Sequence, residues 1–169
     1  MPEQNSQRLL ELVAQDFAPV RDRTDQECIL VGRFMSMVLL VERKLVRLLD
    51  SFDPEIDNRM FGQKIQVYKD FLNAFNWQGD KSEQQGYRDL IAPMTEIKKI
   101  RDAMAHDLAK TSISYSELAR TDSFIKHRRP DLYTTFSSAE DENLRSIGAA
   151  AVFAFIFSTE LAKLQCKLK

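Results

Sequence analysis

The sequence predicts an all-α protein that folds as a single-domain helical bundle of about five to six helices. Its 169 residues match the size of one ordinary domain, which is long enough to bury a hydrophobic core. Only 5 glycines and 5 prolines are present, so tight turns are few and the elements between them are long. Apolar residues recur every three or four positions, as in an amphipathic helix, and no long segment alternates with the period of a strand.

Residues 1–23 are expected to form an N-terminal helix and a linker. Apolar side chains between positions 3 and 17 follow helical spacing. They are Leu9, Leu10, Leu12, Val13 and Phe17. Because Glu3, Glu11 and Asp16 lie where a secretory signal would be apolar, no signal peptide is expected.

Residues 24–110 are expected to form the helical core of the bundle. Thr24 and Glu27 have the spacing of a capping box, which satisfies two backbone amides at the start of a helix. That helix should run to about Ser51, because its apolar side chains share one stripe. The stripe consists of Leu30, Phe34, Met37, Val41, Leu45, Leu48 and Phe52.

Two further helices are expected within this core. One covers about residues 57–75, and the apolar pattern of the other begins at Tyr87 and continues to Leu108. Pro93 lies inside the second pattern, where a proline in mid-helix would lose a backbone hydrogen bond. The sequence therefore predicts either a kink at Pro93 or a helix that restarts there with the proline in its first position.

Residues 111–137 are expected to form an irregular connection, because they are rich in serine and threonine and contain Pro130. A short helix capped by Ser114, with Glu117 three residues further on, is compatible with this pattern. The basic cluster at residues 126–129 is interpreted as a solvated loop, since acidic residues bracket it.

Residues 138–169 are expected to form a C-terminal core helix. Its small residues at 148–151 allow another helix to approach closely, and residues 147–157 form an uninterrupted apolar run. Spanning a bilayer takes roughly 20 residues, so we expect a buried helix and no membrane contact. Because the run is apolar around much of the helix, one neighbouring face does not cover it, and we expect a homodimer.

Composition and spacing exclude several classes of function. The formal net charge is −1 and the isoelectric point is about 6.2, so the protein as a whole has no bulk attraction to nucleic acid or to an anionic membrane. The only cysteines and histidines, Cys28, Cys166, His106 and His127, lack metal-ligand spacing, so we expect no metal and no other cofactor. Two buried, reduced cysteines are typical of a cytoplasmic protein. No glycine-rich phosphate loop and no serine–histidine–aspartate arrangement is discernible.

One short motif carries residues suited to chemistry: Arg101, Asp102 and His106. Asp102 and His106 are four residues apart on a predicted helix, close enough for a hydrogen bond that would orient the imidazole. A histidine with an arginine nearby suffices for metal-independent RNA cleavage, because the imidazole moves protons and the guanidinium stabilises the charged phosphorane. The same residues also fit a structural role, in which His106 ends a core helix and its neighbours solvate it.

The segment Ile97–Leu108, which contains this arginine and histidine, resembles the motif helix of HEPN domains. The preceding Met-Phe-Gly-Gln-Lys-Ile at 60–65 and the following Thr-Ser-Ile-Ser-Tyr-Ser-Glu-Leu at 111–118 are similar to the related helical family of mannitol operon repressor-like proteins. The resemblance covers about residues 28–120 and implies a helical bundle.

The resemblance implies two classes of function. In ribonuclease members two subunits bring their motifs together, and here His106 would be the acid/base, Arg101 the phosphate stabiliser and Asp102 the orienting residue. Other members are regulators, antitoxins or partner-binding modules. Asparagine usually follows the arginine, whereas the charge of Asp102 would repel a phosphate. We therefore expect a non-catalytic protein-binding module, either a mannitol repressor-like regulator or a toxin-neutralising protein of the immunity or antitoxin type. The alternative is a metal-independent endoribonuclease that binds RNA.

Overall fold

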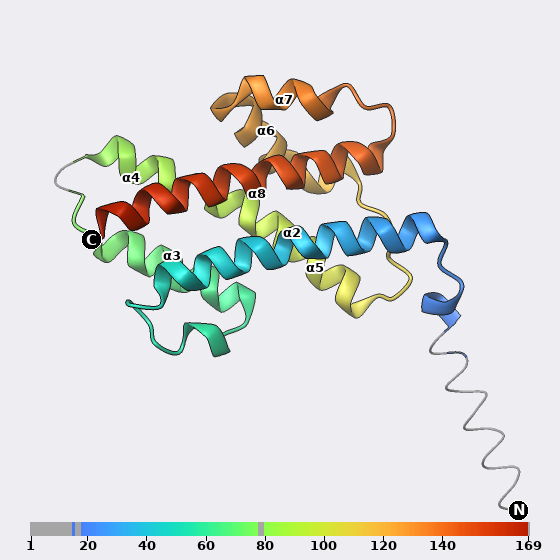
Figure 1. Ribbon diagram of the computed structural model, residues 1–169, viewed down its shortest axis with the longest axis horizontal. Helices are drawn as coiled ribbons and strands as arrows, with labels where there is room; N and C mark the ends of the chain where they lie inside the picture. Colours follow the sequence, from blue (N-terminus) through green and yellow to red (C-terminus); the bar gives the residue numbers. More distant parts are fainter. Residues whose placement is uncertain (1–14, 16–17, 78–79, 169) are drawn as a thin grey trace, which may run out of the picture.

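The computed structural model describes residues 15, 18–77 and 80–168, and Figure 1 shows their arrangement. Within these residues the chain forms seven complete α-helices and no strand, which confirms the predicted all-α bundle. The helices are α2 (Asp25–Leu49), α3 (Phe61–Ala74), α4 (Lys81–Arg88), α5 (Ile91–His106), α6 (Ala119–Arg128), α7 (Pro130–Ser137) and α8 (Glu142–Lys167). The helix predicted at 3–17 lies almost entirely outside the described residues and stays a prediction.

The two longest helices, α2 and α8, lie side by side and run in the same direction (Figure 1). α2 begins with the predicted capping box: the backbone N–H of Thr24 donates to the carboxylate of Glu27 at 2.8 Å, and the N–H of Glu27 donates to the Thr24 hydroxyl at 3.2 Å. α8 begins after Asp141, whose carboxylate accepts a 2.9 Å hydrogen bond from the N–H of Leu144. These caps satisfy amides that lack partners within the helix and so fix where both helices start.

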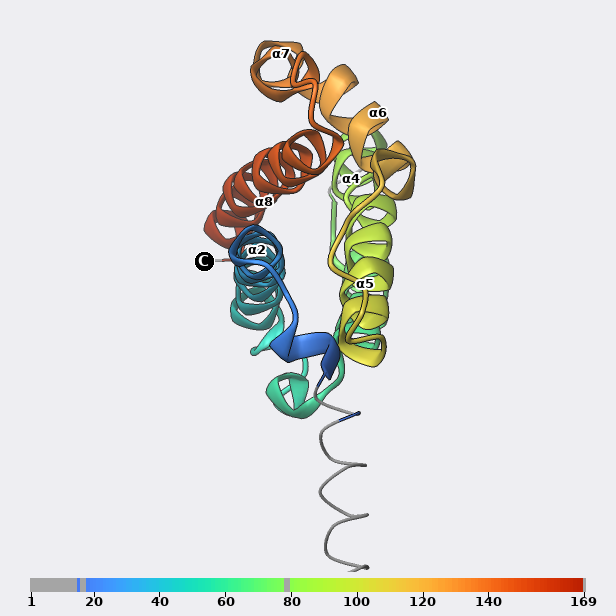
Figure 2. The same cartoon turned by 90° about the vertical axis from the view of Figure 1, so that its right-hand side faces the viewer.

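Helix α5 lies across the bundle from α2 and α8 (Figure 2). Helix α3 also contributes to the core. It begins at Phe61 rather than near residue 57, because Ile56–Asn58 form a separate 3₁₀ helix, η1. Pro93 is the third residue of α5 rather than the first. In the first turn of a helix a backbone N–H has no partner within that helix, so the proline costs no intrahelical hydrogen bond there.

The expectation that residues 111–137 are irregular is wrong. They contain a short 3₁₀ helix, η2 (Tyr115–Leu118), and the helices α6 and α7. η2 begins with the predicted capping box of Ser114 and Glu117. Pro130 does not mark a loop; it is the first residue of α7, where its fixed φ favours a helix and its missing N–H costs nothing.

Helix α6 is capped by another helix. The carboxylate of Glu96 on α5 accepts hydrogen bonds from the backbone N–H groups of Arg120 and Thr121, at 2.9 and 2.8 Å. A cap supplied from so far along the chain leaves no local signal in the sequence. The basic cluster at 126–129 consequently forms the last turn of α6 and its cap rather than a loop.

The core is one cluster of buried apolar side chains to which α2, α5 and α8 all contribute, as the sequence predicts. Phe34 of α2, Ile97 of α5 and Phe153 of α8 are among its members. Helix α7 packs closely on α8 at Gly148, where an added Cβ would overlap the Cβ of Phe136. This contact confirms that the small residues at 148–151 admit a close neighbour.

Helix α8 is the one helix of the described ranges that is long and apolar enough, by length and composition, to cross a bilayer. Core helices of soluble proteins pass the same test, and α8 packs against α2, α6 and α7. The expected burial of the two cysteines is wrong. Cys28 and Cys166 are exposed free thiols, because they lie on the outer faces of α2 and α8.

Candidate functional site

The predicted motif lies in the second half of α5, where its carboxylate is paired along the helix. Nη1 of Arg101 donates a 2.8 Å hydrogen bond to Oδ1 of Asp102, and Nζ of Lys98, one turn earlier, binds Oδ2. Partial burial acts to raise the pKa of Asp102, but the hydrogen bonds and charges of Lys98 and Arg101 outweigh it and hold that pKa below its ordinary value. The carboxylate is therefore charged at neutral pH and neutralises the guanidinium beside it.

His106 is the last residue of α5, and its side chain is exposed. Its imidazole makes no hydrogen bond or ion pair with any residue that the structure describes. The predicted hydrogen bond between Asp102 and His106 is not formed, because the two carboxylate oxygens are held by Lys98 and Arg101. The structure does not bring the three motif residues together into one site.

Within one copy of the chain, the three motif residues are not arranged as an oriented acid/base beside a free cation. A general base must be oriented toward the proton it takes, and the stabilising cation must face the charge that develops. Here Arg101 binds Asp102, and no described residue orients the imidazole of His106. The geometry fits an ion-pair network on the surface of α5.

A second candidate site is the surface on which α2 and α8 turn away from α5 (Figure 2). Large apolar side chains are exposed there: Leu39 is 61% exposed, Leu144 57% and Phe155 56%. We name this surface the α2/α8 face and define it by its exposed apolar residues, Ile29, Leu39, Leu40, Leu144, Ala151 and Phe155. Five of the ten exposed large apolar side chains in the described part of the chain lie on it, a concentration typical of an interaction surface.

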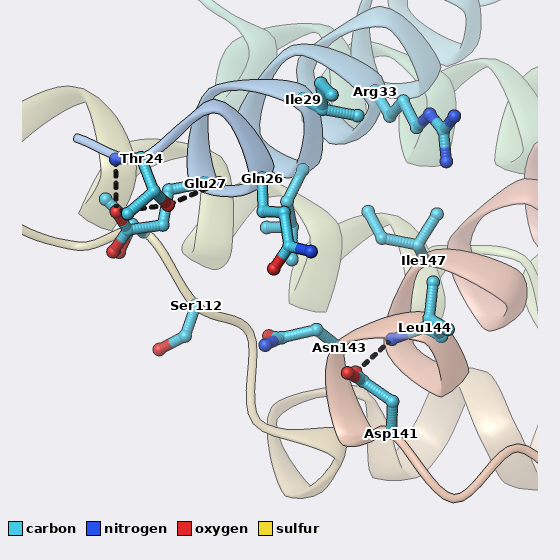
Figure 3. A pocket seen from close by; sticks show the side chains of 12 residues that line it. Thr24, Gln26, Glu27, Ile29, Arg33, Ser112, Asp141, Asn143, Leu144 and Ile147 are labelled. Carbon is cyan, nitrogen blue, oxygen red and sulfur yellow. Dashed lines mark hydrogen bonds between the residues drawn. The ribbon is translucent and has the colours of Figure 1, made fainter.

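A cleft of about 440 Å³ opens at one end of this face, between the first turns of α2 and α8. In Figure 3, Ile29 and Arg33 project from α2 on one side of it, and Leu144 and Ile147 belong to α8 on the other. The cleft is therefore bounded by apolar side chains of both helices, with a guanidinium beside them.

The acidic groups that line the cleft, and the amide of Asn143, are already engaged within the protein. The carboxylate of Glu27 accepts a 2.7 Å hydrogen bond from the hydroxyl of Thr111 and others from Thr24, and these bonds hold the pKa of Glu27 below its ordinary value. The side-chain oxygen of Asn143 accepts a 3.1 Å hydrogen bond from a backbone N–H in the loop before η2. Arg33, by contrast, has no partner among the described residues.

The basic cluster at residues 126–129 does not form a free cationic patch. Arg129 pairs with Asp131 at 2.7 Å. The neighbouring cations lie against a carboxylate of α8 and a tyrosine ring of α7. The cluster is therefore partly neutralised by the fold.

The apolar excess of α8 is visible in the sequence, but the contribution of α2 to the face is hidden there. Leu39 and Leu40 stand inside an unbroken apolar run between the buried residues Val38 and Val41. The position of each residue around the helix axis could have identified Leu39 and Leu40. On a helix they are rotated by about 100° and 200° from Val38, away from the buried stripe.

No protein-family model matches the chain, and no curated protein or solved structure matches it significantly. Its function is therefore proposed from the geometry of these two candidate sites.

Proposed function

We propose that the chain is a non-catalytic protein-binding module that uses the α2/α8 face. One observation carries the proposal: Leu39, Leu144 and Phe155 are each more than half exposed on the two longest helices of the bundle. Covering apolar surface is favourable by about 25 cal/mol per Å². A partner that covers these side chains therefore removes their apolar surface from water, and this burial favours binding.

Two kinds of binding protein fit this proposal. One is a regulator similar to the mannitol operon repressor-like proteins, and the other is a toxin-neutralising protein of the immunity or antitoxin type. Both act by holding another protein, so neither needs a metal or a cofactor. A cytoplasmic location belongs to the proposal, since the free thiols of Cys28 and Cys166 are typical of a reducing compartment.

A metal-independent ribonuclease is the second candidate, and one observation favours it: the imidazole of His106 is exposed and free of partners among the described residues. In that case His106 is the acid/base, Arg101 stabilises the phosphorane and Asp102 orients the site. The ion pairs of Asp102 oppose this candidate, because they occupy the guanidinium and put a negative charge where a phosphate would bind.

Site-specific photo-cross-linking in cells that naturally express the chain tests the proposal. Benzoylphenylalanine in place of Phe155 reports on the α2/α8 face, and the same residue in place of the exposed Lys99 reports on α5, across the bundle (Figure 2). We expect a discrete adduct with another protein from position 155 and none from position 99. Adducts with RNA, or the same adducts from both positions, would contradict the proposal.

A further inference from the structure

The cations of α2 are unpaired, unlike many others in the protein. Arg33, Arg43, Lys44 and Arg47 form no ion pair or hydrogen bond with any described residue, and the three arginines are exposed. Several cations elsewhere are paired, among them Arg129 and others on α3, α5, α6 and α8. The outer side of α2 therefore carries cations that form no ion pair within the described part of the chain.

The carboxylates of α2 only partly balance these cations: Asp25 and the C-cap residue Asp50 are exposed and unpaired among the described residues, one at each end of the helix. Glu27 is bonded to Thr111 and Thr24, and Glu42 accepts a 2.7 Å hydrogen bond from Lys64.

The exposed charge of α8 between its first and last turns is Lys163, which is paired with Glu160. The exposed uncharged residues of α8 before its last turn are Leu144 in its first turn, followed by Ala151, Phe155, Thr159 and Ala162. The α2/α8 face thus combines exposed apolar side chains with an excess of positive charge, because α2 carries four unpaired cations and has two unpaired carboxylates at its ends, as far as the described residues go.

We propose that the α2/α8 face binds an acidic amphipathic helix of a partner protein. This inference rests on the proposed function and specifies the chemistry of the partner. Apolar side chains of that helix cover Leu40 and Phe155, and one large apolar side chain enters the cleft beside Leu144. Its carboxylates pair with Arg33 and Arg43, since arginine binds a carboxylate through two parallel hydrogen bonds.

The shape of the face suits a helix. α2 has 25 residues, about 37 Å at the rise of an α-helix, and α8 runs beside it in the same direction (Figure 1). An amphipathic helix binds through side chains that recur every three or four residues and enter a row of apolar contacts. The cleft at one end provides a recess that one anchoring side chain can enter, and anchors of this kind contribute much of the energy of an interface.

Other occupants match the face less well. A second copy of the chain would bring two sets of four unpaired cations into one interface, and among the described residues only Asp25 and Asp50, at the two ends of each α2, would offset them. RNA would pair its phosphates with the arginines but leave the leucines uncovered, and Phe155 alone offers little stacking. A flat anionic membrane would satisfy the cations but would leave the cleft unfilled.

Fluorescence anisotropy with the full-length chain and two labelled peptides of about 20 residues tests the inference. One peptide carries leucine on one helical side and glutamate on the other, and the second has lysine in place of glutamate. We expect the glutamate peptide to bind and the lysine peptide not to bind. Raising NaCl from about 0.05 M to about 0.5 M should weaken binding about tenfold or more, because salt screens exposed charges.

Variants of the face sharpen the test. Arg33→Glu combined with Arg43→Glu should weaken the glutamate peptide about tenfold or more and allow the lysine peptide to bind. Leu144→Ser, at the cleft, should also weaken the glutamate peptide. Lys99→Glu makes the same charge reversal at an exposed position of α5 and should leave binding unchanged. Thermal melts by circular dichroism show that each variant is folded.

The inference is overturned if the glutamate peptide fails to bind at about 1 mM, if both peptides bind equally, or if the arginine reversal has no effect. It is also overturned if vesicles with phosphatidylserine, or poly-uridine RNA, bind more tightly than the glutamate peptide. A protein cross-link from position 155 with a negative peptide result leaves the protein-binding proposal standing and rejects only the acidic partner. Failure of both experiments rejects both.

Discussion

The guanidinium of Arg101 donates a 2.8 Å hydrogen bond to the carboxylate of Asp102, its neighbour in the sequence. Both side chains are about one third exposed, at 32% and 29%, so solvent screens the pair only in part. The carboxylate neutralises the guanidinium and repels a phosphate that approaches its remaining N–H groups. The proposal that the motif is not catalytic rests on this contact.

The pair of Lys64 on α3 and Glu42 on α2 gives a prediction about stability. Their Nζ–Oε1 distance is 2.7 Å, and the Lys64 side chain is only 6% exposed. Glu42→Ala leaves this ammonium buried without a partner, so we expect the free energy of unfolding in urea to fall by about 3 kcal/mol. The double variant Glu42→Leu with Lys64→Met removes both charges and should recover most of the loss. A loss under about 1 kcal/mol in Glu42→Ala would contradict the prediction.

Gly148 and Gly32 should respond in opposite directions to the same substitution. Nothing lies within 4 Å of a Cβ added at Gly32, so Gly32→Ala should stabilise the protein by about 0.5–1 kcal/mol through helix propensity. At Gly148 the added Cβ overlaps Phe136, so Gly148→Ala should destabilise it by about 1–3 kcal/mol. Thermal melts of both variants beside the wild type make the comparison. Shifts of the same sign would show that α7 does not pack on α8 as described.

Glu27 makes stability depend on pH. The hydrogen bond from Thr111, and after it those from Thr24, hold the pKa of Glu27 below its ordinary value of 4.5. The unfolded chain therefore takes up the proton first, so the stabilisation is present above about pH 4.5 and is lost as the pH falls through the folded-state pKa. Thr111→Val removes the strongest of these bonds. We expect the fall in Tm between about pH 6 and about pH 3 to be smaller in Thr111→Val, and an unchanged pH profile would argue against the contact.

Those parts of the fold that have local signals could be predicted from the sequence. The start of α2 follows from Thr24 and Glu27, and the close contact at Gly148 follows from the small residues around it. The helix α6 could not be predicted in this way, because its cap is Glu96 on another helix. The same limit hides the α2/α8 face, since exposure of Leu40 depends on which helices pack against α2.

For the candidate site, the sequence supplied the residues but not their pairing. Asp102 has Lys98 one turn before it, His106 one turn after it and Arg101 beside it, and spacing alone does not rank these partners. In the structure the two permanent cations hold the carboxylate, and the imidazole at the end of α5 is left without it. The charges of Lys98 and Arg101 favour these two partners, because a hydrogen bond between two charged groups is among the stronger ones.

Cleavage of single-stranded RNA in the presence of EDTA tests most directly the central claim, that the motif on α5 is not catalytic. The wild type is compared with Asp102→Asn, which introduces the asparagine typical of the HEPN motif and releases Arg101. We predict no cleavage above buffer by either protein. Metal-independent cleavage by either one that falls about 10²–10⁴-fold in the same protein when His106→Ala is introduced, with the fold retained, would contradict the claim and support a ribonuclease.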